Sequence, residues 1–237
     1  MWWWLGVALA SEPSTGAEWL QAIDAAATKS QDASLHLAID ATTRTGATTH
    51  RELDLWQKGD DERLLRLTDP PMVAGTALLS RGDGELHLYL PSFERVRRIV
   101  GNSRGDSFMG TDFTMEDLAR VTFEREWTAT VESAAEGLQV LHLDPVDAKA
   151  HESAALRLWV QPGSFLVVRV EHLDAQGKAL RRVELGDFRD VAGRSFAHRI
   201  QVDDLEKERH SVAIVSNVQV DTGLSDELFT VTHLSGK

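Results

Sequence analysis

The sequence predicts a mainly β protein (α+β) built on a single, strongly curved antiparallel sheet with two or three helices. Period-two alternation of apolar and polar residues recurs in roughly ten segments. Short turns containing glycine join most of these segments, and only two or three stretches have helical periodicity. Such a pattern is also typical of closed barrels and sandwiches. The alternation alone therefore leaves the closure of the sheet open.

The first regular element is a helix predicted at residues 17–30. Its apolar side chains recur at helical spacing, and they are Trp19, Leu20, Ile23, Ala26 and Ala27. Glu18 falls in the first turn and Lys29 in the last turn, and both charges are favourable to the helix dipole.

Half-buried strands are predicted wherever apolar residues alternate along the chain. In the first half, the alternating residues are Leu35, Leu37, Ile39 and Ala41, then Leu53 and Leu55, Leu65 and Leu67, and Leu86, Leu88 and Leu90. In the second half, the predicted strands are residues 138–143, 156–160, 165–172, 179–185, 196–202 and 212–220. Hairpin turns are predicted at residues 45–46, 58–61, 81–84, 161–163 and 174–177.

The composition is that of one ordinary globular domain. No linker or charge block divides the chain, so we predict a single domain at residues 17–237. A net charge of −12 argues against a nucleic-acid partner and against tight adsorption on anionic lipid headgroups. The absence of cysteine excludes disulfides, thiol catalysis and zinc held by cysteine.

No catalytic or metal-binding signature occurs in the sequence. Glycines flank Ser103 at residues 101–105, but their spacing is not that of a nucleophile elbow. The nine histidines show no recognised ligand spacing, and His151-Glu152 lacks a second histidine. We therefore expect no catalytic residue, no metal site, no cofactor and no enzymatic activity.

The N-terminus indicates export. Residues 2–10 are wholly apolar, and Ala8-Leu9-Ala10 forms a small-x-small site before Ser11. This pattern predicts that residues 1–10 are a signal peptide or the remnant of one. The alternative is a disordered apolar tail. No other run approaches the ~20 apolar residues of a membrane span, so we expect no stable membrane insertion.

The segment at residues 88–118 is the most informative part of the chain. After an apolar strand and an arginine run, a loop with three glycines carries Phe108, Met109, Phe113 and Met115. Loops are usually polar, so these side chains indicate either a mobile cover that contacts an apolar ligand or a plug in the core. In either case Asp112, a candidate polar contact of the cover, begins an acidic stretch that leads into a short helix.

The arginine run and three aromatic residues are further candidates. Arg95 and Arg97 share one strand face, whereas Arg98 points to the other. These arginines could form weak surface ion pairs with the acidic stretch, hold the cover closed or meet a polar lipid headgroup. The aromatic candidates for a pocket lining are Trp56, Tyr89 and Trp159, whose alternation equally permits ordinary core positions.

Residues 88–118 also carry a resemblance. The order YLP, RVRRI and SFMGTDFTMEDL is similar to the periplasmic outer-membrane lipoprotein-sorting proteins of the LolA-like superfamily. More narrowly, it resembles the branch found beside transporters of the resistance-nodulation-division type. The strings PPMVAGTALL, LRLWV and LSDELFTVTHL extend the resemblance over nearly all of the chain after residue 17. The resemblance implies an incomplete, cone-like barrel whose concave face is covered by the helices.

The function implied is that of a monomeric periplasmic carrier. Its cargo would be lipoprotein acyl chains or another lipid, taken from an inner-membrane transporter and passed toward the outer membrane. One rival is an accessory or regulatory module of a transporter that carries nothing. The other is an enzyme on a similar barrel, which would need a catalytic cluster that the sequence does not show.

Overall fold

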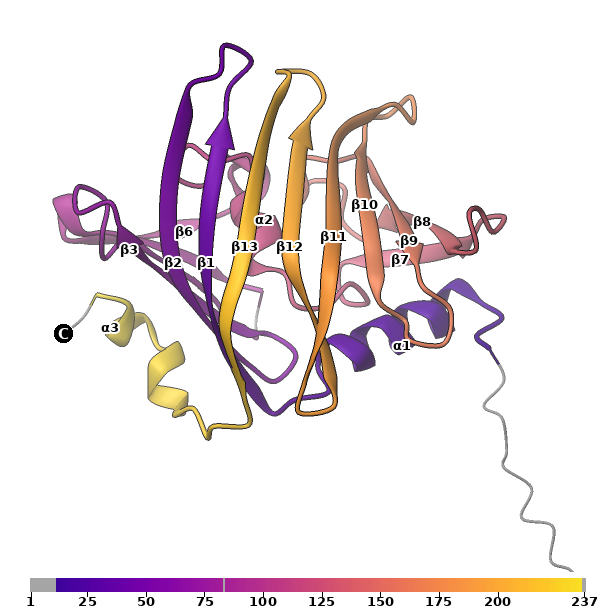
Figure 1. The fold of residues 1–237 in the computed structure, drawn as a ribbon, viewed down its shortest axis with the longest axis horizontal. Helices are drawn as coiled ribbons and strands as arrows, with labels where there is room; N and C mark the ends of the chain where they lie inside the picture. The colour runs from indigo at the N-terminus through magenta and orange to yellow at the C-terminus, as the bar shows by residue number, and fades with distance from the viewer. Residues whose placement is uncertain (1–11, 83, 236–237) are drawn as a thin grey trace, which may run out of the picture.

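The computed structural model describes residues 12–82 and 84–235, and one antiparallel sheet dominates it (Figure 1). The thirteen strands follow the order β6-β5-β4-β3-β2-β1-β13-β12-β11-β10-β9-β8-β7. The strands β6 and β7 form the two free edges of this order, so the sheet is not closed into a barrel. The prediction of a mainly β fold on a single curved antiparallel sheet is thereby confirmed.

The elements have the following bounds. The strands are β1 (Asp32–Thr42), β2 (Thr48–Lys58), β3 (Glu62–Asp69), β4 (Ala77–Ser80), β5 (Leu86–Leu90), β6 (Arg95–Ile99), β7 (Trp127–Val131), β8 (Gln139–Pro145), β9 (Ala155–Val160), β10 (Val167–Leu173), β11 (Ala179–Val191), β12 (Arg194–Asp204) and β13 (Arg209–Val220). The helices are α1 (Gly16–Ala27), α2 (Met115–Ala119) and α3 (Val231–Leu234), with 3-10 turns η1 (Pro91–Phe93), η2 (Gly101–Gly105) and η3 (Asp226–Phe229).

Apolar side chains of neighbouring strands meet in register on the concave face. Leu37 of β1 lies opposite Leu53 of β2 and Val215 of β13. Leu53 in turn lies opposite Leu67 of β3. All four belong to one buried cluster. Because alternate residues of each strand face the same way, this register gives the sheet a continuous apolar inner surface.

The helix α1 begins at a capping box and covers the β7–β9 side of that surface. The Thr15 hydroxyl accepts the Glu18 N–H at 3.2 Å, and the Glu18 carboxylate accepts the Thr15 N–H at 3.0 Å. Trp19, Leu20 and Ile23 are buried in a cluster with side chains of β7, β8 and β9. The helix ends at Ala27 rather than at the predicted residue 30.

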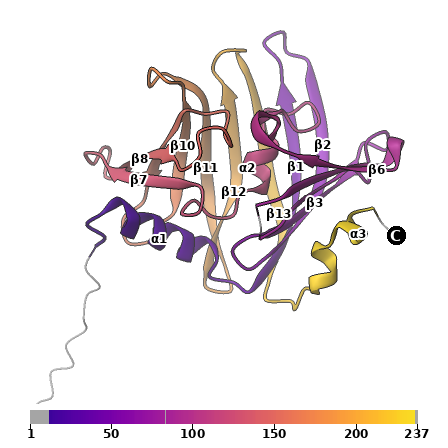
Figure 2. The same cartoon turned by 180° about the vertical axis from the view of Figure 1, so that it is seen from behind.

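A second covering element, the inner loop (residues 107–119), lies within the curve of the sheet and contains α2 (Figure 2). Val183 of β11 packs against the cluster of the inner loop and against the cluster of α1, so both elements lie on the same face. The third helix differs, because α3 and η3 pack against Leu64 and Leu79 on the opposite face of the sheet. Of the three α-helices in the described part of the chain, two therefore cover the concave face.

Residues 1–10, which the sequence predicts to be a signal peptide, lie outside the described residues. Within the described part, no helix is long and apolar enough to cross a membrane.

The contact between α1 and the edge of the sheet can be tested at Gly16. A Cβ at this position would lie 1.8 Å from the carbonyl oxygen of Ala129 in β7. We expect Gly16→Ala to lower the free energy of unfolding by about 1–3 kcal/mol, because α1 must move off the sheet. Urea denaturation measures this loss.

The matched control is Gly186→Ala in β11, where an added Cβ would meet nothing within 4 Å. Its unfolding midpoint should stay close to that of the wild type. Equal stability of the two variants would contradict the close approach of α1 to β7.

Candidate functional site

A largely apolar cavity of about 360 Å³ lies between the concave face and its two covering elements. Its apolar wall consists of Ile23, Ala26, Ala27, Ala33, Leu35, Leu37, Leu55, Phe113, Leu118, Val121, Phe123, Phe165, Leu166, Val167, Val170, Val183, Leu185, Phe188, Phe196, Ala197, Ile200 and Val215. The volume falls within the range of ordinary small-ligand sites, which are also mostly apolar. The cavity is therefore the candidate ligand site of the molecule.

The part of the wall on β11 and β12 is incompletely packed. Val183, Leu185, Phe188, Phe196 and Ile200 line the cavity and are only half-buried. Apolar surface left in contact with water costs roughly 25 cal/mol per Å². A ligand with an apolar chain would remove this surface from water, whereas a polar ligand would find few partners on these two strands.

The inner loop is a well-packed part of the core. Phe108, Phe113 and Met115 are only 1%, 3% and 8% exposed, and all three join the cluster on the concave face. The Phe108 N–H donates to the Phe113 carbonyl at 2.8 Å, which closes the loop on itself. Of these three side chains, Phe113 also lines the cavity. The loop is thus at once a plug in the core and one wall of the candidate site.

A buried ion pair fixes α2 to the sheet. The Asp117 carboxylate accepts from the Arg181 guanidinium of β11, with Nη2 at 3.0 Å from Oδ1. The Nε2 atom of His172 in β10 lies 3.4 Å from the same oxygen. Burial acts to raise the pKa of Asp117, but the Arg181 charge and the His172 hydrogen bond outweigh it and hold the pKa well below 3.8.

The same contacts also shift the pKa of His172. Burial and the neighbouring Arg181 charge lower the pKa of His172 below 6.5, which favours the neutral imidazole. The result is a buried Asp117–Arg181 pair with a neutral histidine beside it. Because Asp117, His172 and one carbonyl of the inner loop (Asp112) all contact Arg181, this arginine joins the loop to two strands.

Other contacts hold the first half of the inner loop to the sheet. The Ser211 hydroxyl of β13 donates to Asp112 Oδ2 at 2.7 Å, and Arg209 Nη2 lies 3.0 Å from Asp112 Oδ1. Arg51 of β2 donates from Nε to the Met109 carbonyl at 3.0 Å. Asp112, only 4% exposed, is therefore an anchoring residue of the loop.

Arg63 of β3 holds the C-terminal end of α2. Its Nη1 donates to the carbonyl oxygens of Leu118, at 3.2 Å, and Arg120. Burial lowers the pKa of Arg63 to about 10, so the guanidinium remains charged at neutral pH. A cation at the carbonyl end of a helix is favourable to the helix dipole.

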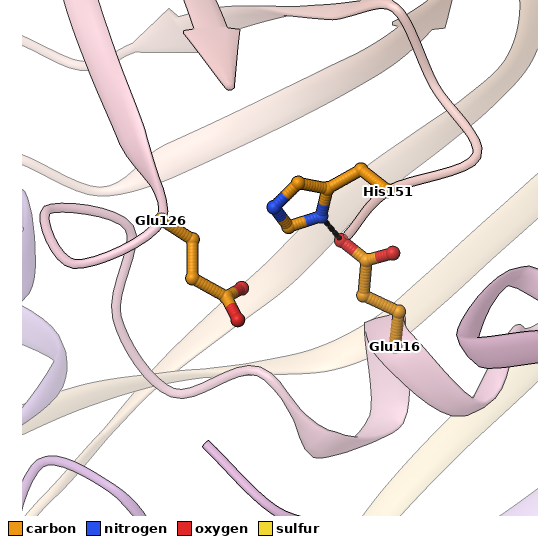
Figure 3. A group of neighbouring side chains, drawn as sticks. All are labelled: Glu116, Glu126 and His151. Atoms are coloured by element: carbon orange, nitrogen blue, oxygen red, sulfur yellow. Dashed lines mark hydrogen bonds and ion pairs between the residues drawn. The ribbon is translucent and has the colours of Figure 1, made fainter. Parts of the chain in front are cut away.

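Glu116, Glu126 and His151 come together beside α2, with potential ligand atoms within 4.8 Å of one another (Figure 3). His151 Nδ1 lies 2.8 Å from Glu116 Oε1. Each carboxylate also faces an arginine, because Glu116 is paired with Arg120 and Glu126 lies 2.8 Å from Arg104. A metal ion would have to displace these two guanidinium groups, so the geometry favours an ion-pair network over a metal centre.

The predicted aromatic residues lie on the opposite face from the cavity. Trp56 and Tyr89 pack against the cluster that contains Phe229 and Leu234 of the C-terminal segment. Trp159 lies under the guanidinium of Arg169, which is 5.1 Å from the ring centroid. In the structure these three residues are not part of the cavity wall.

The predicted arginine run lies on the edge strand β6. Arg95, Arg97 and Arg98 are exposed, and Arg98 lies 3.0 Å from Glu85. Within the described residues, none of the three forms an ion pair with the inner loop. Arginines that sequence reasoning did not single out anchor the loop instead, namely Arg51, Arg63, Arg181 and Arg209.

Comparisons with known proteins place the fold. A protein-family model described as "Uncharacterized protein" matches residues 59–236. In sequence, no curated protein matches the chain.

Three solved structures share the architecture over nearly the whole chain. A DUF1329 family protein from Desulfovibrio piger has a TM-score of 0.84 at 23% identity, covering 92% of this chain and 97% of its own. A domain named for outer membrane lipoprotein sorting, from Vibrio parahaemolyticus, has a TM-score of 0.83 at 23% identity, with 93% and 98% covered. A LolA superfamily protein from Nitrosomonas europaea has a TM-score of 0.78 at 21% identity, with 93% and 100% covered. The fold is therefore LolA-like.

The anchor of α2 can be tested with a double-mutant cycle. Asp117→Asn should lower the free energy of unfolding by about 3–5 kcal/mol, because it leaves the Arg181 charge buried without a counter-charge. Arg181→Met should have a comparable effect. The double variant should lose clearly less than the sum of both losses in urea unfolding. Strict additivity would show that the two side chains do not act as a pair.

A second prediction concerns the stability of the protein at low pH. The Arg120 charge and the His151 hydrogen bond outweigh burial and lower the pKa of Glu116 from 4.5 to about 2. The stability that follows from this lowered pKa is fully present above 4.5 and is lost as the pH falls from 4.5 toward 2. We expect Glu116→Gln to remove a component on the order of 3 kcal/mol from that window. Parallel stability curves for wild type and variant between these pH values would refute this assignment.

Proposed function

The chain belongs to the family whose model, described as "Uncharacterized protein", matches residues 59–236, and we propose that it carries an acylated ligand in the apolar cavity. One observation supports this proposal above the others. The cavity of about 360 Å³ has an apolar wall that stays half-buried on β11 and β12, in a fold shared with a domain named for outer membrane lipoprotein sorting and with a LolA superfamily protein.

The physical basis is hydrophobic burial. Each methylene group moved from water into such a cavity contributes ~0.8 kcal/mol. A saturated chain needs no hydrogen-bond partner, which agrees with the apolar residues Val183, Leu185 and Ile200 in the wall. Binding of this kind requires no chemical step, so the proposed role is that of a carrier rather than an enzyme.

The cargo class and the location are further parts of this proposal. We propose lipoprotein acyl chains or another lipid as cargo, and the periplasm as the compartment, where a monomer would pass cargo from an inner-membrane transporter toward the outer membrane. The apolar N-terminal residues 2–10 support export. The lipoprotein-sorting name of the Vibrio parahaemolyticus domain supports the cargo class.

A transporter-accessory module is the second candidate, and the edge of the sheet favours it. Arg95 and Arg97 of β6 are exposed, and Phe93 of the adjoining turn η1 is 69% exposed. An edge strand with basic side chains and an exposed aromatic residue beside it is suited to pairing with another protein. This module would contain no lipid.

The carrier proposal can be tested by filling the cavity. Val183→Phe adds bulk to a half-buried side chain of the cavity wall, so a fluorescent fatty acyl probe should bind at least about 10-fold more weakly. Fluorescence titration of the purified chain measures the change. The matched control is Ile214→Phe, whose side chain is 48% exposed on the other face of the sheet and should leave binding unchanged. Wild-type protein that does not bind the acyl probe would support the accessory module instead.

A further inference from the structure

A second hollow, the arginine cleft, adjoins the apolar cavity. It has a volume of about 470 Å³, and Arg120 and Val121 form part of the wall of both spaces. Its charged wall consists of Arg81, Arg104, Arg120, Arg125, Asp60, Asp61 and Glu126. The apolar cavity thus borders directly on a concentration of guanidinium groups, in a chain whose net charge is −12.

Three of these arginines are held in place by carboxylates. Arg104 Nη2 lies 2.8 Å from Glu126 Oε1, and Arg125 Nη1 lies 2.9 Å from Asp61 Oδ2. Arg120 is paired with Glu116, and its guanidinium lies over the rings of Phe123 and Trp127 at 5.2 and 5.7 Å from their centroids. These pairs fix the positions of the donors before any ligand arrives, which lowers the entropy cost of binding.

The cleft nevertheless has more donors than acceptors. Among residues 12–82 and 84–235 the guanidinium of Arg81 has no hydrogen bond and no close ion pair, although its charge interacts with that of Glu62. The Nε atoms of Arg104 and Arg120 are buried and have no acceptor there either. Because these Nε atoms are shielded from solvent, a ligand in the cleft would pair with the Arg81 guanidinium and with the Nη atoms of the other arginines.

We propose that the arginine cleft binds the phosphate-type headgroup of an anionic amphiphile whose acyl chain occupies the apolar cavity. The inference rests on the proposed carrier function and names the class of its cargo. Guanidinium groups match phosphate oxygens by paired hydrogen bonds. A charged headgroup is costly to place against the apolar wall, and Arg120 offers it a guanidinium where the cavity meets the cleft.

The test compares two ligands with the same chain. Isothermal titration of the full chain with 1-lauroyl lysophosphatidic acid and with 1-lauroylglycerol separates the headgroup from the chain. We expect the phosphate ligand to bind about 10-fold or more tightly than the neutral one. Arg81→Gln should remove most of this difference and leave the neutral ligand unaffected, because Arg81 lies in the arginine cleft but not in the wall of the cavity.

Arg98→Gln is the matched control, since Arg98 is an arginine of the edge strand β6 outside the cleft. Both ligands should bind this variant as they bind the wild type. An equal effect of Arg98→Gln and Arg81→Gln would overturn the proposal, because attraction by overall charge would then explain the preference. Equal affinity of the wild type for both ligands would overturn it too and would leave the carrier function standing.

Two further outcomes distinguish a failure of the carrier function from a failure of the headgroup assignment. If neither lauroyl ligand binds, the proposed function itself fails. Glycerol 3-phosphate, which has the headgroup without the chain, should bind far more weakly than the phosphate amphiphile. Equally tight binding of glycerol 3-phosphate would show that the cleft is a site for free phosphate compounds, which overturns its role as the headgroup site of the cargo.

Discussion

The buried ion pair between Asp117 and Arg181 is the interaction on which the arrangement of the site depends. A strongly curved open sheet cannot fill its own concavity, because its inward side chains extend only a short way from one surface and meet no facing layer. The inner loop supplies the missing apolar volume through Phe108, Phe113 and Met115. The same loop carries acidic residues into the interior, and a buried carboxylate is tolerated only when it is paired and hydrogen-bonded. Arginines of the sheet therefore have to meet the loop, and they fix its position.

The cavity exists because α1 and the inner loop cover different parts of the concave face. The helix α1 covers β7 to β9 with Trp19, Leu20 and Ile23, whereas the cluster of the inner loop includes side chains of β1 to β6, β12 and β13. Neither element extends fully over β11 and β12, where Val183 contacts the edges of both clusters. The inner loop reaches β11 at Arg181, where the ion pair with Asp117 holds it, and the apolar side chains further along β11 and β12 remain half-buried. The space beside them is left unfilled, and it is suited to an apolar chain.

Sequence periodicity predicted the sheet well and its faces poorly. Alternation in β1, β2 and β3 is strong, so these strands were predictable. Strand β4, whose first three residues are all buried, has no such alternation. The edge strand β7 alternates apolar residues with threonine, but it is only five residues long and was not predicted. Alternation also does not show which face points inward. Leucines occur on both faces of β3 because the C-terminal segment covers the convex side, and this cover places Trp56 and Tyr89 away from the cavity. Only knowledge of that long-range contact would have resolved the ambiguity.

The charged contacts were equally hard to predict, since their partners are distant in sequence. Sequence proximity favoured Arg95, Arg97 and Arg98 as partners of the acidic stretch, but Arg181 and Arg209 reach it through the sheet order. The signal that could have indicated them is an arginine within an apolar alternation, as at Arg181 before Val183 and Leu185. Arg120, which follows α2, combines several of these contacts at the site. It is paired with Glu116, stacked on Phe123 and shared by the cavity and the arginine cleft. Arg120 therefore neutralises the buried carboxylate of Glu116 in α2. It also places a positive charge where the apolar chain of a ligand would end.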